Sequence, residues 1–527
     1  MADAADTRDY FRFCPGEEEI KLSNAVCRGR RRSNYFKCKG CQFNDEEKAA
    51  ADRVDRPSGP IDTGESLARV FKAYDVRGLV PDPLSENAAW RIGYATAQFL
   101  RTKISAVEMV TPSARTVVVG RDMRTHSPAL QSALMDGIRA SGLDVVNIGL
   151  IDTPQLYFAV SHLSACGGVQ TTASHNPAAW NGFKICGAGA KPVGAGTGLE
   201  SIRDIACRVP RHQTGTTARL NDLDLSAPYK TFVRRFLIDQ PALPRPIKVV
   251  IDASNGVAGR WFPLLFGDVG GLTIRALHFE HDGTFVHEPN PLIDANLRML
   301  RETVLAEQAD LGACFDGDAD RCVFVDEKGA ILRCDAITAL LARAFLERNP
   351  GAAIVYDLRS SRIVRDEVLR AGGVPVRERV GHAFMKKTLA ERNAVFGGEL
   401  SGHFYFRDNA FCDSAFLAFA HVLNLLAASS RKMSELVKPF RKYHASGEIN
   451  FENAEPEATF ARLLERFQDA ECDQLDGLTV AYPDWWFNIR KSNTEPLLRL
   501  NLEANTKKLL DEKLKLLAAM LGKRVDH

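Results

Sequence analysis

The sequence predicts an α/β protein with several domains. Three observations lead to this prediction: short β-branched runs alternate with helical patterns, the alternation restarts twice along the chain, and a different pattern begins near residue 442. A chain of 527 residues is also too long for one hydrophobic core, so about three or four compact units are expected.

The first alternation begins at residue 116. Thr116–Gly120 is a β-branched run that ends on a turn glycine, and Asp144–Ile148 is a second strand. Between them, Ser127–Ser141 carries leucine and isoleucine at every fourth position, which is typical of a helix. This order of elements predicts a buried sheet that is parallel or mixed.

The alternation restarts at Ile247–Asp252 and at Ala353–Asp357, where each strand is followed by a polar or glycine-bearing turn. The longest apolar run, Ala415–Ala428, contains His421 and Asn424. It is too short and too polar to span a bilayer, so we expect a buried helix.

A smaller α+β domain is predicted after about Lys442. Leu498, Leu500 and Leu502 alternate with polar residues, which predicts a strand with one solvent-facing side. The segment Lys507–Leu521 then has a helical pattern. Together they favour an antiparallel sheet that is covered on one side.

The composition is that of an ordinary globular protein, with 45% apolar and 25% charged residues. A net charge of +2 provides no global basic field that would attract nucleic acid or acidic membranes. Met1–Phe13 is charged and lacks an apolar core, so it does not resemble a secretory signal. We therefore expect a cytoplasmic protein without a membrane partner.

A polar cluster at Thr171–Pro177 contains the groups needed for nucleophilic chemistry. Ser174 supplies a hydroxyl and His175 a neighbouring proton acceptor. The same residue types also build turns through their hydrogen-bonding side chains, so the cluster alone leaves both interpretations open.

A second cluster, Asp316-Gly-Asp-Ala-Asp-Arg321, lies between two apolar runs. The carboxylates of Asp316, Asp318 and Asp320 would repel one another unless a cation neutralised them, and such hard oxygen ligands suit Mg²⁺ or Ca²⁺. An EF-hand is excluded because Arg321 stands where that loop needs glycine. The alternative is a solvated acidic turn.

Two further clusters have the groups that bind a sugar phosphate. Gly397–His403 presents Glu399, Ser401 and His403 at alternating positions, and a carboxylate with a hydroxyl is what vicinal sugar hydroxyls need. Arg490–Pro496 combines side-chain donors with turn backbone, which suits a phosphate. Its donors are Arg490, Ser492, Asn493 and Thr494. An ordinary β-turn and a polar hairpin are the respective alternatives.

In this order the four clusters resemble those of the α-D-phosphohexomutase superfamily, of the phosphomannomutase/phosphoglucomutase type. Phe71-Lys-Ala-Tyr-Asp-Val-Arg-Gly78 and Asn181-Gly-Phe-Lys-Ile185 agree with the same family. The resemblance covers roughly residues 66–527. It implies three related α/β domains and a smaller C-terminal α+β domain around a central cleft.

The predicted domains follow from this resemblance. They are a cysteine-bearing extension and linker (1–65), a phosphoserine domain (66–228), a metal-loop domain (229–328), a sugar-binding domain (329–442) and a phosphate-binding C-terminal domain (443–527).

The resemblance also implies a role for each motif residue. The implied catalytic residues are Ser174, His175, Arg77, Lys184 and His403. The implied substrate-binding residues are Tyr74, Arg321, His382, Glu399, Ser401, Arg490, Ser492, Asn493 and Thr494. The implied ligands of Mg²⁺ are Ser174, Asp316, Asp318 and Asp320.

The implied reaction interconverts hexose 1-phosphate and hexose 6-phosphate. Phospho-Ser174 gives its phosphoryl group to the free hydroxyl of the sugar, the hexose 1,6-bisphosphate turns over, and Ser174 takes back the other phosphate. Hexose 1,6-bisphosphate is therefore also the expected activator. The residues agree with this chemistry, because phosphoryl transfer depends mainly on charge neutralisation and placement.

Small departures from the family pattern bear on the substrate. Leu400 replaces a methionine common in this loop, and Arg359 stands where the family often has lysine, which keeps the charge but changes the geometry. The loop also lacks the glutamine of phosphoglucosamine mutases, which favours mannose or glucose phosphates. The alternatives are a phosphoglucosamine mutase, a phosphatase with the same metal loop, and an inactive scaffold whose N-terminal metal site is an interaction module.

The resemblance does not explain residues 1–65. Cys14, Cys27, Cys38 and Cys41 lie close together there, among many arginines and lysines. A segment this short and polar has no core of its own, so the four thiolates predict a Zn²⁺ site that folds it. An iron–sulfur cluster and a disordered tail are the alternatives, and a nucleic-acid or protein partner of this basic segment stays open.

Overall fold

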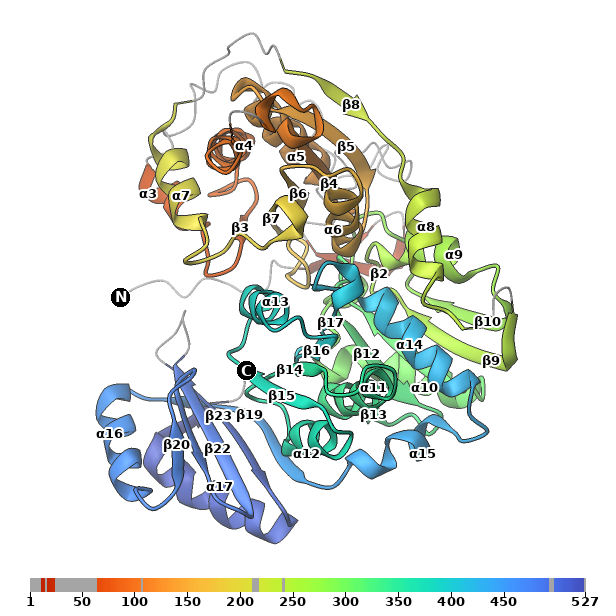
Figure 1. Ribbon diagram of the computed structural model, residues 1–527, viewed down its shortest axis with the longest axis vertical. Helices are drawn as coiled ribbons and strands as arrows, with labels where there is room; N and C mark the ends of the chain where they lie inside the picture. Colours follow the sequence, from red (N-terminus) through yellow and green to blue (C-terminus); the bar gives the residue numbers. More distant parts are fainter. Residues whose placement is uncertain are drawn as a thin grey trace.

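The computed structural model describes residues 11–14, 17–23, 64–105, 108–210, 218–238, 242–491 and 497–525. Strands β1 (Phe11–Cys14) and β2 (Glu17–Ser23) form an antiparallel hairpin. Four larger sheets contain the other described strands. Figure 1 shows these sheets with their helices, from the N-terminal domain at the top to the C-terminal domain at the bottom left.

The first domain contains a six-stranded mixed sheet in the order β3-β7-β6-β4-β5-β8. Its strands are β3 (Val76–Leu79), β4 (Thr116–Arg121), β5 (Asp144–Leu150), β6 (Gly167–Thr171), β7 (Trp180–Gly187) and β8 (Leu220–Asp222). Its helices are α3 (Gly64–Ala68), α4 (Glu86–Arg101), α5 (Ser127–Ala140), α6 (Thr153–His162) and α7 (Leu199–Arg208), whereas α8 (Ser226–Arg234) packs against the second domain. The predicted first alternation corresponds to β4, α5 and β5 and is confirmed.

The second and third domains each contain a five-stranded sheet, in the orders β10-β9-β11-β12-β13 and β15-β14-β16-β17-β18. The strands of the second are β9 (Ala242–Asp252), β10 (Gly270–Leu277), β11 (Leu311–Phe315), β12 (Cys322–Asp326) and β13 (Ile331–Leu332). Those of the third are β14 (Ala353–Asp357), β15 (Val374–Glu378), β16 (Phe396–Gly398), β17 (Phe404–Phe406) and β18 (Cys412–Asp413).

The helices of these two domains complete the α/β pattern. They are α9 (Ala258–Phe266), α10 (Arg298–Ala306), α11 (Cys334–Arg348), α12 (Arg362–Arg370), α13 (His382–Glu391), α14 (Ala415–Ala427) and α15 (Met433–Val437). Both predicted restarts of the alternation are strands, β9 and β14.

The three sheets share one pattern of strand pairing. β4 pairs in parallel with β5 and β6, and β6 pairs antiparallel with β7. In the second domain β9 pairs in parallel with β10 and β11, and β11 pairs antiparallel with β12. In the third domain β14 pairs in parallel with β15 and β16, and β16 pairs antiparallel with β17. The predicted relation of the three α/β domains is confirmed. In each domain, the turn between the last parallel strand and the antiparallel strand occupies the same corner of the sheet.

Helix α14 joins the second and third domains through a shared apolar core. The ring of Phe419 lies 4.9 Å from Phe262 and 5.1 Å from Phe266, both on α9. The side-chain amide of Asn424 donates to the Phe236 carbonyl at 2.6 Å, which satisfies a polar group inside this apolar helix. The predicted buried helix is confirmed, because elements of two domains cover it.

The C-terminal domain is a smaller α+β unit with its own apolar core. Its sheet has the order β20-β21-β22-β23-β19-β24. The strands are β19 (His444–Glu452), β20 (Glu471–Asp473), β21 (Leu478–Ala481), β22 (Trp485–Lys491), β23 (Leu497–Ala504) and β24 (Lys523–Val525), and the helices are α16 (Pro456–Arg466) and α17 (Lys507–Leu521). The predicted fold class is therefore confirmed.

The predicted solvent-facing side of strand β23 is wrong. Asn501 and Glu503 on its polar side are both buried. The Glu503 carboxylate accepts hydrogen bonds from the backbone N–H of Arg362 at 3.0 Å and from the indole N–H of Trp486 at 2.9 Å. The third domain therefore covers this polar face.

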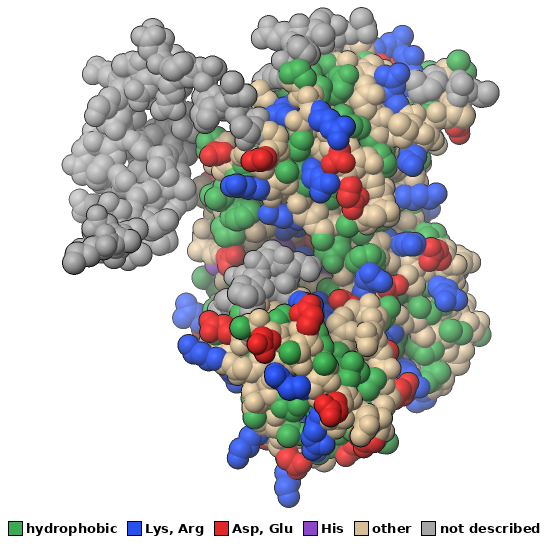
Figure 2. All heavy atoms as spheres, turned by 90° about the vertical axis from the view of Figure 1, so that its left-hand side faces the viewer, with side chains coloured by type: hydrophobic (Ala, Val, Ile, Leu, Met, Phe, Trp, Pro, Cys, Tyr) green, Lys and Arg blue, Asp and Glu red, His purple; other side chains and the backbone are tan. Residues whose placement is uncertain are grey.

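The surface has no clear preference for one sign of charge on the face drawn in Figure 2. Lysine and arginine side chains are interspersed there with aspartate and glutamate. Among the described helices, none is long and apolar enough to cross a membrane.

Candidate active site

Three loops in equivalent positions bring the predicted catalytic residues together. The loop after β6 contains Ser174, the loop after β11 contains Asp316, and the loop after β16 contains Glu399. The second and third loops also contact each other, because the Cys322 backbone N–H donates to the Gly402 carbonyl at 3.0 Å. The shared strand pattern thus places three different chemical groups at one site.

The backbone of the first loop points the hydroxyl of Ser174 at the acidic loop. Ser174 has a left-handed backbone, with φ of 51°, and its N–H donates to Thr172 Oγ1 at 2.9 Å. Its carbonyl accepts a hydrogen bond from Arg124 at 2.9 Å. The fully buried Ser174 Oγ donates to Asp316 Oδ2 at 2.8 Å and lies 3.2 Å from His175 Nδ1.

The three aspartates of the second loop form a buried cluster in which one carboxylate oxygen from each lies within 4.8 Å of the other two. Lys184 Nζ donates to Asp318 Oδ2 at 2.7 Å and also contacts Asp320 Oδ2, and Thr153 Oγ1 donates to Asp318 Oδ2 at 2.6 Å. Among the described residues, Asp318 Oδ1 and Asp320 Oδ1 have no hydrogen-bond partner. Orphaned, buried carboxylate oxygens in an all-oxygen set fit Mg²⁺ well.

The carboxylates of this cluster differ in acidity. Burial and the charges of Asp320 and Asp318 raise the pKa of Asp316 well above its usual range. Burial also opposes ionisation of Asp320, but Lys184 and His403 hold its pKa well below the usual range. One ammonium group therefore does not neutralise all three carboxylates.

The two histidines nearest the cluster have opposite tendencies to bind a proton. Burial and then Arg321 lower the pKa of His175 well below 6.5. Burial and Arg321 also oppose protonation of His403, but Asp320 and Glu399 outweigh them and raise its pKa to about 9. The surroundings of His403 therefore favour a bound proton, whereas those of His175 favour the neutral ring.

Arg77 binds the serine loop within the first domain, whereas Tyr74 reaches the third domain. The guanidinium of Arg77, on β3, donates to Asp75 Oδ2 at 2.8 Å and to Asn176 Oδ1 in the serine loop at 2.6 Å. The hydroxyl of Tyr74 donates to the Val380 carbonyl of the third domain at 3.1 Å.

Glu399 and Ser401 lie in the third loop, as predicted for sugar-binding residues. The Glu399 carboxylate accepts a hydrogen bond from the backbone N–H of Gly381 at 3.0 Å. Ser401 Oγ lies 3.0 Å from His403 Nδ1. His382, at the start of α13, has no hydrogen-bond partner at Nδ1 among the described residues.

Arg490, on β22, is the only one of the four predicted phosphate ligands that the structure describes. Its guanidinium donates to Glu448 at 2.8 Å and lies 3.8 Å from Asp476. Burial and then the nearby positive charge of Arg359 lower the pKa of Arg490. Arg359 itself donates to Asp357 at 2.8 Å. The predicted residues outside the described ranges are Ser492, Asn493 and Thr494.

The four predicted zinc ligands are not described either. Cys27, Cys38 and Cys41 lie outside the described residues, and of Cys14 only the backbone, in β1, is described.

Four family models match consecutive parts of the chain. Those for the α/β/α domains I, II and III of phosphoglucomutase/phosphomannomutase match residues 68–207, 228–329 and 333–443, and that for the C-terminal domain matches 448–519. The chain belongs to the phosphoglucomutase/phosphomannomutase family. The predicted family is confirmed.

Individual relatives agree with this membership. A phosphomannomutase of Salmonella montevideo is 38% identical over 448 residues, which cover 82% of this chain and 94% of that protein. A protein named phosphohexose mutases from Xanthomonas campestris pv. campestris (strain B100) is 41% identical over 438 residues, with the same coverage. A crystal structure of a phosphoglucomutase/phosphomannomutase family protein from Burkholderia thailandensis has a TM-score of 0.78 and 32% identity, covering 86% of this chain and 97% of that one.

As a member of this family, the chain is an isomerase-class phosphotransferase. The family is metal-dependent, and the cluster of Asp316, Asp318 and Asp320 is an acidic metal site that suits this chemistry.

Arg124 is a residue of the site that the family motifs did not single out. Its fully buried guanidinium pairs with Asp122 at 3.1 Å. It also donates to four carbonyl oxygens of the serine loop, at 2.6 to 3.0 Å, those of Ser174, Asn176, Pro177 and Trp180. A charged pair directly after the buried strand β4 is the sequence signal that could have found it.

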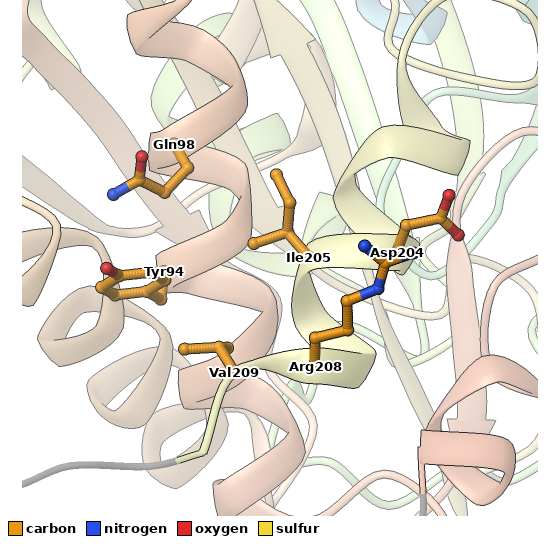
Figure 3. Close-up of a pocket in the computed structure, with 6 residues that line it drawn as sticks. All are labelled: Tyr94, Gln98, Asp204, Ile205, Arg208 and Val209. Atoms are coloured by element: carbon orange, nitrogen blue, oxygen red, sulfur yellow. The ribbon is translucent and has the colours of Figure 1, made fainter.

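A hollow of about 410 Å³ in the first domain lies apart from these residues. Figure 3 shows that its lining comes from α4 and from α7 with the residue that follows it. The lining residues are Tyr94, Gln98, Asp204, Ile205, Arg208 and Val209. None of them is a predicted site residue, so we assign this hollow no part in the reaction.

We expect Arg124→Lys to lower kcat on the order of 100-fold, because lysine keeps the charge beside Asp122 but cannot bind four carbonyls at once. Steady-state kinetics should show a much smaller change in KM. Arg121→Lys is the matched control, since among the described residues the guanidinium of Arg121 donates to a single group, the Asp122 carbonyl at 3.2 Å. Unchanged kcat in a folded Arg124→Lys variant would contradict this positioning role.

Proposed function

We propose that this protein is a phosphohexomutase that interconverts hexose 1-phosphate and hexose 6-phosphate through phospho-Ser174. The observation that carries the proposal is the 2.8 Å contact of Ser174 Oγ with Asp316 in the acidic cluster. A nucleophile beside a cation site is the arrangement that phosphoryl transfer requires. The names of the relatives, phosphomannomutase and phosphohexose mutases, support mannose or glucose phosphates as substrates.

The first half-reaction transfers the phosphoryl group from the enzyme to the sugar. The free hydroxyl of hexose 1-phosphate attacks the phosphorus of phospho-Ser174, the bond from phosphorus to Ser174 Oγ breaks, and hexose 1,6-bisphosphate forms. The proton lost by the sugar hydroxyl balances the one that Ser174 Oγ gains. In the second half, Ser174 Oγ attacks the other phosphate, and hexose 6-phosphate leaves.

Proton transfer at Ser174 has two acceptors within reach. Asp316 Oδ2 lies 2.8 Å and His175 Nδ1 3.2 Å from Ser174 Oγ. In this proposal His175, whose pKa is lowered, supports the serine as a proton acceptor, and His403, whose pKa is raised, donates a proton near the transferring group.

Positive charge around the transferred group comes from side chains and from a metal ion. Arg77 and Lys184 supply fixed charges next to the serine loop. Mg²⁺, when bound by Ser174 and the three aspartates, supplies the further charge that stabilises the transferring phosphoryl group.

The remaining residues orient the sugar and its second phosphate. Glu399 and Ser401 bind vicinal hydroxyls of the hexose, and Tyr74, Arg321 and His382 line the same site. The phosphate that is not transferred binds the cradle formed by Arg490, Ser492, Asn493 and Thr494. One cradle must accept either end of the sugar, because the bisphosphate turns over between the two half-reactions.

We expect Ser174→Ala to lower mutase turnover by several orders of magnitude, because the phosphoryl group loses its carrier. The assay uses purified protein with mannose 1-phosphate, glucose 1-phosphate or glucosamine 1-phosphate, with and without glucose 1,6-bisphosphate. Ser164→Ala is the matched control, since Ser164 in the same domain has a similar φ of 52°. Near-normal turnover of the Ser174 variant, or release of inorganic phosphate in place of the isomer, would refute the proposal.

We expect EDTA to abolish activity and Mg²⁺ to restore it, because a cation relieves the repulsion among the three buried carboxylates. An Asp→Asn change at 316, 318 or 320 should weaken Mg²⁺ binding and turnover together, as measured by calorimetry and kinetics. Asp294→Asn, at an exposed position, is the control. Full activity of metal-free protein is the outcome that contradicts this role.

We also propose that Cys14, Cys27, Cys38 and Cys41 bind one Zn²⁺ as thiolates, and that this module is separate from catalysis. Deleting residues 1–60 should lower the zinc content by about one per chain and leave kcat within about twofold. Elemental analysis and kinetics of both forms measure this. Equal zinc content in the two forms, or loss of activity on deletion, would show that the proposal is wrong.

A further inference from the structure

A second cluster of metal-binding side chains lies one strand away from the acidic loop. Asp252 ends β9, His278 follows β10, and His287 lies in the next loop. One ligand atom from each lies within 4.8 Å of the other two. Because β9 pairs with β11, Asp252 is opposite Cys314, two residues before Asp316. No family motif identified in the sequence includes these three residues.

When the ring of His287 is neutral, the hydrogen bonds of this cluster leave two acceptor atoms facing each other. His287 Nδ1 lies 2.8 Å from the Glu288 carbonyl, and because a carbonyl only accepts, Nδ1 carries the hydrogen. In the neutral ring, Nε2 then has a lone pair, and it lies 3.5 Å from Asp252 Oδ2. Neither atom has a hydrogen-bond partner among the described residues, and Asp252 is fully buried. A cation between them would satisfy both.

The distances in the cluster suit a transition-metal ion. His278 Nδ1 lies 3.0 Å from Asp252 Oδ1, and His287 Nε2 lies 3.5 Å from Asp252 Oδ2. Two ligands of Zn²⁺ at its usual bond lengths and tetrahedral angle lie roughly 3.4 Å apart. Two imidazoles with one carboxylate favour Zn²⁺ over Mg²⁺, which prefers oxygen. The bond from His287 to a backbone carbonyl is also the outer contact that zinc-bound histidines usually make.

We propose that Asp252, His278 and His287 form a binding site for a divalent transition-metal ion, with Zn²⁺ the best-suited ion. This site is distinct from the acidic cluster and from the N-terminal cysteines. The ion joins the ends of β9 and β10 to the loop 279–289.

The loop 279–289, which contains His287, packs against the part of the first domain that holds the catalytic serine. A Cβ on Gly283 would lie 2.8 Å from the backbone of the first domain, so the two segments pack closely. The guanidinium of Arg124 lies 5.1 Å from the centre of the Phe285 ring. Arg124 in turn binds the carbonyl of Ser174 at 2.9 Å. The ion therefore stabilises the surface on which the serine loop rests.

The test compares the zinc content of the full chain with that of His287→Gln and of a control, His281→Gln. His281 lies in the same loop but is not part of the cluster, and the hydrogen bond that its ring makes within the described residues is to the Phe279 carbonyl, at 3.0 Å. Each protein is loaded with Zn²⁺ and dialysed against excess Mg²⁺. We expect His287→Gln to lose about one zinc per chain relative to the other two. The thiolates and the acidic loop contribute equally to all three proteins, so the difference isolates this site.

A second measurement separates loss of the ion from loss of the fold. In EDTA the Tm of His287→Gln should match that of the wild type, and added Zn²⁺ should raise the Tm of the wild type and of His281→Gln by more than that of His287→Gln. Equal zinc content in wild type and His287→Gln overturns the proposal and assigns the contact to a protonated His287 paired with Asp252. If His287→Gln does not fold, X-ray absorption at the zinc edge of the wild type decides. A coordination shell with imidazole supports the site, and one without imidazole overturns it.

Discussion

The burial of three carboxylates in one short loop is the constraint on which the rest of the structure depends. A buried, uncompensated charge costs several kcal/mol, so Asp316, Asp318 and Asp320 need partners from outside their own loop. The chain supplies Lys184 from β7 and Thr153 from α6, both in the first domain. The first and second domains are therefore tied at the active site by polar contacts that neither could satisfy alone.

The repeated strand pattern explains how one chain assembles different chemistry at one place. Each α/β domain contributes the turn after its last parallel strand, and these turns contain the proposed nucleophile, the proposed metal ligands and the proposed sugar-binding groups. Close backbone packing holds the turns together, since a Cβ on Gly317 would lie 2.4 Å from the Ser174 carbonyl. The same corner of the same fold thus carries three functions, and only the loop sequences differ.

Local features of the fold could be predicted from the sequence, whereas features that depend on distant partners could not. Periodicity placed the strand Ala353–Asp357 and the helix Lys507–Leu521 where the structure has them, because both patterns are complete within their own segments. The polar face of β23 was misjudged because alternation distinguishes two faces but does not say what covers them. Arg124 was missed for the same reason, since its partners lie 50 or more residues away.

The apolar cores divide the molecule in a way that suits the proposed turnover of the intermediate. The second and third domains share one continuous core with part of the first, which fixes the serine, metal and sugar loops relative to one another. The C-terminal domain has a separate core and meets the third domain through polar contacts, such as those of Arg362 with the carbonyls of Pro483 and Trp485. Polar interfaces between domains part more easily than apolar ones. Arg490 therefore belongs to the domain whose core is separate from that of the serine, metal and sugar loops, which suits the turnover of the sugar in the proposed reaction.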